Sequence, residues 1–130
     1  MEQVDDSSVA LVVDDENMNV FCMRAQLMDL GISCDSTMVS TNAVKIVEDR
    51  IAKVLRGTAK MFKILLIDYS MPDMDGLELV RKLRSLLDEN NLSEEQPIYC
   101  CCTAYNTVEY RDIAISSGFD YFMVKPIKKD

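Results

Sequence analysis

Two short apolar runs, the second interrupted only by Lys63, dominate the sequence, and each ends abruptly at an aspartate. The run over residues 9–13 stops at Asp14 and Asp15, and the run over residues 62–67 stops at Asp68. Continuous apolar runs of this length are typical of strands that a parallel sheet buries on both faces. Similar segments at 98–102 and 121–124, with a weaker one at 33–38, predict three further strands.

Between these predicted strands, apolar residues recur at helical spacing. We expect the first helix to bury a stripe made of Met18, Phe21, Ala25 and Met28 and to end near Gly31. Stripes beginning at Val44 and Leu77 predict two more helices, and a capping signal at Asn106 predicts a fourth that ends at Ser117. Strands that alternate with helices indicate an α/β fold with a doubly wound parallel sheet.

The length of 130 residues fits one domain, so we expect a single domain over 1–130 with an acidic, flexible N-terminal stretch over 1–8. The net charge of -8 and the lack of a long basic run argue against direct binding to nucleic acid. No apolar run approaches the roughly 20 residues of a membrane span, and we expect a cytoplasmic protein. The five cysteines lack C-x-x-C spacing and are interpreted as reduced, buried apolar residues.

Polar residues that could take part in catalysis or metal binding follow the predicted strands. Asp14 and Asp15 end the first strand, Asp68 the third, Thr103 the fourth and Lys125 the fifth. Because the carboxyl ends of parallel strands form the ligand-binding edge of an open sheet, we expect these five side chains to converge.

Three neighbouring carboxylates repel one another, and a divalent cation relieves that repulsion. The chain has no histidine, so oxygen ligands and magnesium are expected, and manganese could replace magnesium. A carboxylate can act as a nucleophile toward a phosphoryl group, and Asp68 is the candidate. Lys125 would contribute positive charge, and the Thr103 hydroxyl would donate a hydrogen bond to a phosphoryl oxygen.

With these motifs in order, the chain from Val9 to Ile127 resembles the receiver domains of response regulators and hybrid histidine kinases. The segment V-V-D-D-E at 12–16 is similar to the acidic pair of that family, and Asn19 resembles the residue found in receivers of hybrid kinases. The segment L-I-D-Y-S-M-P-D-M-D-G at 66–76 resembles the phosphoacceptor strand and loop. Thr103-Ala104 and Lys125-Pro126 are similar to the switch threonine and to the lysine with its usually cis proline bond.

The resemblance implies a flavodoxin-like sheet with strand order 2-1-3-4-5 and a function in a phosphorelay. It also implies a signalling switch and not a classical enzyme, since the only reactions that the domain would catalyse are its own phosphorylation and dephosphorylation. It implies that Asp15, Asp68 and the backbone carbonyl of Ser70 ligate magnesium directly, with Asp14 acting through water. Thr103 and Phe122 would form the conformational switch. Ser70 and Tyr105 occupy the positions that set the lifetime of the phosphate.

The phosphoryl donor would be a histidine kinase or a histidine phosphotransfer protein, because the chain has no histidine of its own. Only four residues follow Pro126, where the family has a fifth helix, so we expect that helix to be missing or truncated. The uncovered surface would favour self-association and lower stability.

Two other functions remain open at this point. A magnesium-dependent phosphohydrolase of similar architecture would need a second acid two residues after the nucleophile, where this chain has Ser70. A binding module could keep the fold without ever being phosphorylated.

Overall fold

The computed structural model describes residues 6–104 and 107–125, and all predicted strands lie within these ranges. The elements in chain order are β1 (Ala10–Val13), α1 (Asn17–Asp29), β2 (Cys34–Thr37), α2 (Ser40–Leu55), β3 (Ile64–Asp68), α3 (Gly76–Glu89), a 3₁₀ turn (Ser93–Glu95), β4 (Ile98–Thr103), α4 (Val108–Ser116) and β5 (Tyr121–Val124). The predicted order of elements is therefore confirmed.

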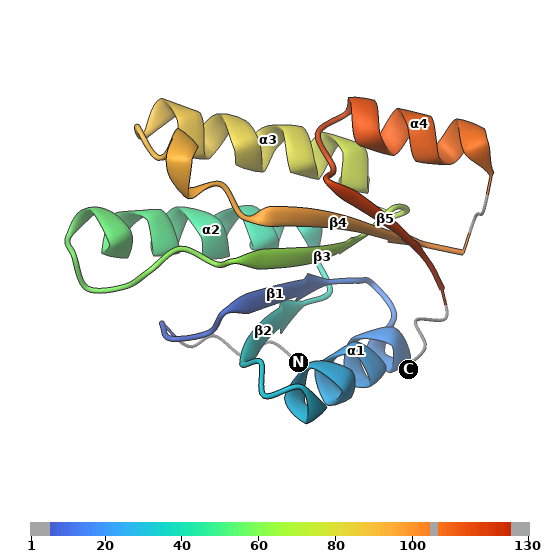
Figure 1. Ribbon diagram of the computed structural model, residues 1–130, viewed down its shortest axis with the longest axis horizontal. Helices are drawn as coiled ribbons and strands as arrows, with labels where there is room; N and C mark the ends of the chain where they lie inside the picture. The colour runs from blue at the N-terminus through green and yellow to red at the C-terminus, as the bar shows by residue number, and fades with distance from the viewer. Residues whose placement is uncertain (1–5, 105–106, 126–130) are drawn as a thin grey trace.

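The five strands form one parallel sheet in the order β2-β1-β3-β4-β5, as predicted. The chain starts in the middle of the sheet, at β1, then forms β2 on one side and β3, β4 and β5 on the other (Figure 1). Val13 aligns with Thr37 on β2 and with Ile67 on β3. This register places the residues that follow β1 beside the end of β3.

Helices cover both faces of the sheet, with α1 on one side and α2, α3 and α4 on the other (Figure 1). Leu11, Val13, Leu65 and Ile67 belong to the core that includes buried residues of α2 and α3. The alternate residues of the strands, including Val12 and Leu66, pack with α1. Both faces of the central strands are buried, which explains why their sequences are continuously apolar.

The predicted buried face of the first helix is wrong. Met18, Phe21 and Met28 of α1 are 67%, 67% and 72% exposed, and Ala25 is also exposed. The residues that contact the sheet are instead Val20, Met23 and Leu27. Helix α1 carries apolar residues at helical spacing on two faces, so spacing alone could not identify the buried face.

The capping and cysteine predictions need smaller corrections. The N-cap of α4 is Thr107, whose hydroxyl accepts a hydrogen bond from the Tyr110 N–H, whereas the predicted cap Asn106 lies outside the described residues. Cys100, Cys101 and Cys102 are buried as expected. In contrast, Cys22 is exposed and Cys34 is only partly buried, so two of the five cysteines depart from the prediction.

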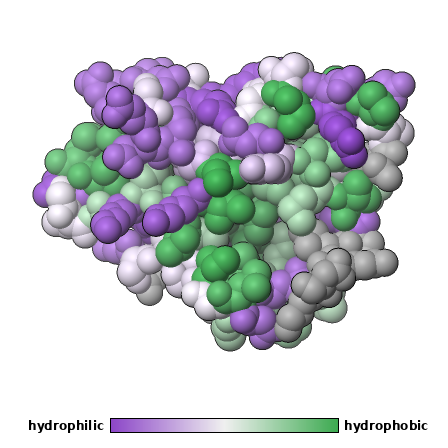
Figure 2. All heavy atoms as spheres, in the orientation of Figure 1, coloured by the Kyte–Doolittle hydropathy of each residue, from purple (hydrophilic) through white to green (hydrophobic). Residues whose placement is uncertain are grey.

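Part of the sheet near β5 is open to solvent. Ile98, Tyr121 and Met123 are exposed by 45%, 60% and 37%. Figure 2 shows hydrophobic side chains gathered in the lower middle of the viewed surface. Residues 126–130, on which the expected truncation of a fifth helix falls, lie outside the described residues. None of the helices within residues 6–104 and 107–125 combines the length and the apolar character that a membrane span requires.

Candidate functional site

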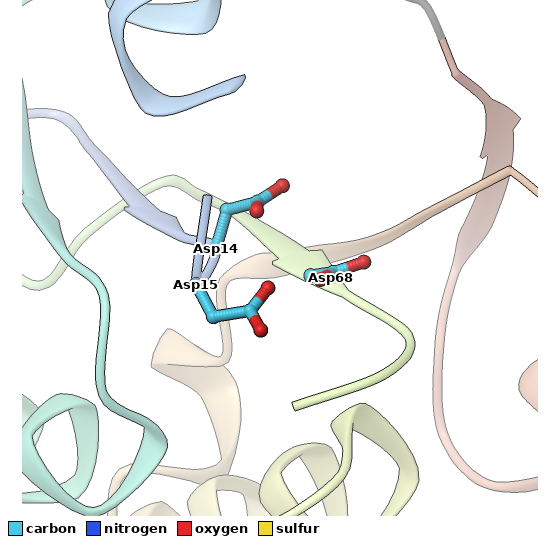
Figure 3. A group of neighbouring side chains, drawn as sticks. All are labelled: Asp14, Asp15 and Asp68. Carbon is cyan, nitrogen blue, oxygen red and sulfur yellow. The ribbon is translucent and has the colours of Figure 1, made fainter. Parts of the chain in front are cut away.

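Three aspartates meet at the carboxyl end of the sheet. Asp14 and Asp15 follow β1, Asp68 is the last residue of β3, and all three extend into the same opening (Figure 3). A carboxylate oxygen from each lies within 4.8 Å of the others. Asp14 is fully buried, Asp68 is 7% exposed and Asp15 is exposed. The predicted convergence of these side chains is therefore observed.

Lys125 joins the aspartates from the end of β5. Its Nζ atom lies 2.7 Å from Asp14 Oδ2 and 2.9 Å from Asp68 Oδ1. Its backbone N–H donates to the carbonyl oxygen of Thr103, at 2.6 Å, which ties the residue to the end of β4. One ammonium group thus contacts two of the three carboxylates.

Burial and charge alter the protonation of this cluster. Burial raises the pKa of Asp68 to about 6; the hydrogen bond from Lys125 opposes that rise and the charge of Asp14 adds to it. Burial alone would lower the pKa of Lys125, but its close contacts with the Asp14 and Asp68 carboxylates raise it overall. Lys125 therefore stays charged, whereas Asp68 titrates at mildly acidic pH, with a pKa of about 6.

The cluster has the donor chemistry of a magnesium site. Asp14 Oδ2 is buried and lies close to the Lys125 ammonium. Among the described residues, this oxygen accepts no hydrogen bond. Asp14 Oδ1 accepts hydrogen bonds from the Glu16 N–H (2.9 Å) and the Asn19 amide (3.4 Å). Hard oxygen ligands of this kind suit Mg²⁺, and one positive charge from Lys125 does not neutralise three carboxylates.

The predicted switch residues occupy neighbouring strands. Thr103 ends β4 and is 1% exposed, and Phe122 of β5 is partly buried. The guanidinium of Arg111 on α4 lies over the Phe122 ring, 5.7 Å from its centroid. Tyr69, which directly follows Asp68, packs edge to face against Tyr110 of α4 at 5.3 Å. Neither aromatic contact could be predicted from the sequence.

The loop between Asp68 and α3 carries the other predicted site residues. Ser70 is exposed in this loop, and Met71 is buried beneath it. Asp75 caps α3 by accepting a hydrogen bond from the Glu78 N–H at 2.9 Å. At Gly76, an added Cβ would lie 2.5 Å from the carbonyl oxygen of Asp68, so the chain packs too closely there for a side chain.

Asp73 is a loop residue for which the sequence predicts no role. Its two carboxylate oxygens accept hydrogen bonds from the Ser40 N–H (3.3 Å) and the Thr41 N–H (2.9 Å) at the start of α2. The only local sign is that Val39, the N-cap of α2, has no side-chain acceptor. Tyr105 and the Lys125-Pro126 bond also bear on the predicted site, but Tyr105 and Pro126 lie outside the described residues.

Comparison with known proteins assigns this architecture to a family. Residues 10–130 match the family model described as the response regulator receiver domain. Hybrid signal transduction histidine kinase L of Dictyostelium discoideum is 29% identical over 92% of this chain, which covers 6% of that protein. The autoinducer 2 sensor kinase/phosphatase LuxQ of Vibrio harveyi is 27% identical over 97% of the chain, which covers 13% of that protein. The chain thus spans a small part of these relatives.

Solved structures share the fold. The receiver domain of the histidine kinase CKI1 from Arabidopsis thaliana complexed with Mg²⁺ superposes with a TM-score of 0.80 at 22% identity, over 91% of this chain and 83% of that one. A co-crystal structure of the Saccharomyces cerevisiae phosphotransfer protein Ypd1 with the receiver domain of the response regulator Ssk1 gives 0.76 at 21% identity, over 97% and 83%. At these identities the likeness establishes the fold alone.

Proposed function

Because this chain belongs to the response regulator receiver domain family, we propose that it is a phosphorelay switch that accepts a phosphoryl group on Asp68. The observation that carries the proposal is the contact of Lys125 with Asp68 beside two further carboxylates. We further propose that residues 1–130 act as one such domain. The protein is a signalling switch, and its own chemistry is limited to phosphorylating and dephosphorylating itself.

In the proposed reaction, a carboxylate oxygen of Asp68 forms a bond to phosphorus as the phosphorus–nitrogen bond of a phosphohistidine breaks. The products are an acyl phosphate on Asp68 and a neutral histidine on the donor, after the imidazole regains its proton. Lys125 would hold the attacking carboxylate in place through its 2.9 Å contact and stabilise negative charge on the phosphoryl oxygens. Asp68 reacts in its ionised form, which its pKa of about 6 allows at neutral pH.

We propose that Asp15, Asp68 and the backbone carbonyl of Ser70 would hold Mg²⁺ directly, with Asp14 acting through water. When bound, Mg²⁺ supplies the positive charge that three carboxylates and a phosphoryl group require. The mutual proximity of the three aspartates, within 4.8 Å, supports this assignment. The part played by the protein is to position these oxygens at the ends of β1 and β3.

For the switch, we propose that phosphorylation draws the Thr103 hydroxyl toward the phosphate and lets Phe122 turn inward. Such a change biases an equilibrium between two existing conformations. Phe122 has no hydroxyl, so its position would depend on its packing against the core and on the Arg111 guanidinium over its ring. Ser70 and Tyr105 would set the lifetime of the phosphate, and Tyr105→Ala should accelerate its hydrolysis.

The donor would be a histidine kinase or a histidine phosphotransfer protein, because the chain contains no histidine. Relatives of this chain are named as hybrid histidine kinases, and one structural neighbour is a complex with a phosphotransfer protein. We propose a cytoplasmic location for this exchange and self-association through the exposed residues near β5.

Incubation with acetyl phosphate and Mg²⁺, followed by intact mass measurement, tests the proposal. We expect one added phosphoryl group on the wild-type protein and none on Asp68→Asn, which keeps the size of the side chain but removes the nucleophile. Phosphorylation that persists in Asp68→Asn would contradict the site assignment. A wild-type protein that takes no phosphoryl group while still binding a phosphotransfer protein would favour a binding module.

A further inference from the structure

The loop between β3 and α3, residues 69–75, is hydrogen-bonded to a helix from an earlier part of the chain. Asp73, in the loop after β3, accepts hydrogen bonds from the Ser40 and Thr41 N–H groups, which lie 33 and 32 residues away. In return, the Ser40 hydroxyl donates to the carbonyl oxygen of Met74 at 2.7 Å. Three hydrogen bonds, running in both directions, therefore join this loop to the start of α2.

These bonds satisfy a need of α2 that its own sequence does not meet. The first N–H groups of any helix lack partners within the helix, and a side-chain oxygen at the N-cap usually accepts one of them. Here the N-cap is Val39, whose side chain has no acceptor. The Asp73 carboxylate, from the loop after β3, accepts hydrogen bonds from these N–H groups instead. Its negative charge is also favoured at the positive end of the helix dipole.

The charge of Asp73 is thereby separated from the acidic cluster. Burial opposes its ionised form, but the hydrogen bonds that it accepts, from the Thr41 and Ser40 backbone and the Thr41 hydroxyl among others, together lower the pKa of Asp73. Asp73 therefore remains an anion directed at α2. Its carboxylate is occupied with helix N–H groups and does not compete with Asp14, Asp15 and Asp68.

Asp73 is one of several attachments that hold the loop around Ser70: the Tyr69 N–H donates to the Cys102 carbonyl oxygen at 3.0 Å, and the Met71 side chain is buried in the core. The loop starts at Asp68, which β3 holds, and ends at Gly76, whose N–H donates to the Tyr69 carbonyl at 2.9 Å. Close packing at Gly76 fixes that end against Asp68. Between these ends, Asp73 and Met74 bind α2, three and four residues beyond Ser70.

We propose that Asp73 is a positioning residue: by binding the start of α2, it holds the loop so that the Ser70 carbonyl faces the metal site. This inference rests on the proposed function, since it concerns the same Mg²⁺ site. It also makes the start of α2 a reporter of metal binding. Because coupling between two sites is reciprocal, Mg²⁺ should order the Ser40 and Thr41 amides as Asp73 orders the metal ligand.

Isothermal titration calorimetry with Mg²⁺ alone tests the inference on Asp73→Ala and Asp73→Asn. Both variants lose the same charge, but Asn keeps an oxygen that can accept one helix N–H. We expect Asp73→Ala to weaken Mg²⁺ binding about tenfold, as loss of a supporting contact commonly does, and Asp73→Asn to lie between it and wild type. Phosphorylation by acetyl phosphate should need more Mg²⁺ in Asp73→Ala but reach the wild-type rate at saturation.

Two controls separate position from charge. Ser40→Ala breaks the bond to Met74 without changing any charge and should also weaken Mg²⁺ binding. Asp120→Asn removes a carboxylate that accepts the Tyr99 N–H at 2.8 Å, at the opposite end of the strands, and should leave Mg²⁺ affinity unchanged. In hydrogen exchange, Mg²⁺ should slow exchange of the Thr41 amide in the wild-type protein and have no such effect in Asp73→Ala.

The outcomes distinguish the inference from the proposed function. A folded Asp73→Ala protein that binds Mg²⁺ as tightly as wild type overturns the inference, and so does equal weakening by Asp73→Ala and Asp73→Asn with no effect of Ser40→Ala. If Asp73→Ala does not fold, the comparison of Asp73→Asn and Ser40→Ala with wild type decides in the same way. A wild-type protein that takes neither Mg²⁺ nor a phosphoryl group overturns the proposed function and this inference together.

Discussion

Lys125 and Asp68 are 57 residues apart in the sequence, yet the Lys125 ammonium donates a 2.9 Å hydrogen bond to the Asp68 carboxylate. The same ammonium lies 2.7 Å from Asp14 Oδ2. In the protein without metal, Lys125 is thus the cation that offsets charge between two nearly buried aspartates. This single relationship links the ends of β1, β3 and β5.

Replacing Lys125 with Gln should destabilise the metal-free protein at neutral pH. Asp14 and Asp68 would face each other without a cation, and we expect a loss of about 1–3 kcal/mol in the free energy of unfolding, below the cost for a fully buried pair because Lys125 is partly solvated. Urea denaturation with and without Mg²⁺ measures the effect, and Mg²⁺ should restore much of the loss.

Lys53→Gln is the matched control, since Lys53 also pairs with two aspartates, Asp6 and Asp49, which are largely exposed. Its removal should change stability little. An equal loss in both variants would mean that the Lys125 contact has no special role in balancing the charge of the site.

The raised pKa of Asp68 predicts a pH-dependent stability. The folded protein binds the Asp68 proton more tightly, with a pKa of about 6 against the ordinary aspartate pKa of 3.8. This group therefore contributes stability that is present below the unfolded pKa and is lost as pH rises through the folded pKa. Metal-free Asp68→Asn, which cannot ionise, should exceed wild type by about 1–3 kcal/mol at neutral pH.

Urea midpoints at about pH 4 and about pH 7.5 measure this difference, which should shrink at the lower pH because Asp68 is then protonated in the wild-type protein as well. Added Mg²⁺ should reverse the order, since it stabilises the folded wild type by binding it. A difference that is the same at both pH values would contradict the assigned pKa shift.

The order of elements could be read from the sequence because it depends on local pattern. Each strand that both faces of the sheet bury is a short apolar run, and β5 begins and ends where the sequence predicted, at Tyr121 and Val124. Placement of Asp14, Asp15 and Asp68 at one edge then followed from the parallel arrangement of strands. The rule that ligands bind at this edge needs no knowledge of side-chain packing.

Contacts between distant residues could not be read in this way. Asp73 looks like an ordinary loop residue, and its bonds to Ser40 and Thr41 depend on how α2 and the loop meet in three dimensions. The prediction of the buried face of α1 was wrong for a different reason. Two sets of apolar residues share its helical period, and only the path of the chain decides which set meets the sheet.

The corrected face of α1 gives a prediction about stability. Leu27→Ala removes a buried side chain and should cost about 2–4 kcal/mol of unfolding free energy. Phe21→Ala removes a larger side chain that is 67% exposed and should change stability by about 0.5 kcal/mol or less. Thermal and urea denaturation of the two variants compare them directly. A larger loss for Phe21→Ala would mean that the face carrying Met18 and Phe21 is the buried one.

Gly76→Ala should disturb the site through the backbone of Asp68. The added Cβ would lie 2.5 Å from the Asp68 carbonyl oxygen and 3.2 Å from Tyr69 Cα, and neither backbone atom can move aside as a flexible side chain could. We expect a loss of about 2–4 kcal/mol in stability together with slower phosphorylation by acetyl phosphate, because the shift displaces the acceptor residue.

Gly57→Ala is the control: Gly57 has a φ of +77° but open space around its Cβ position. It should cost about 1 kcal/mol through backbone strain and leave the phosphorylation rate unchanged. If Gly76→Ala resembles Gly57→Ala in both measurements, the close approach of the loop to Asp68 does not constrain the site.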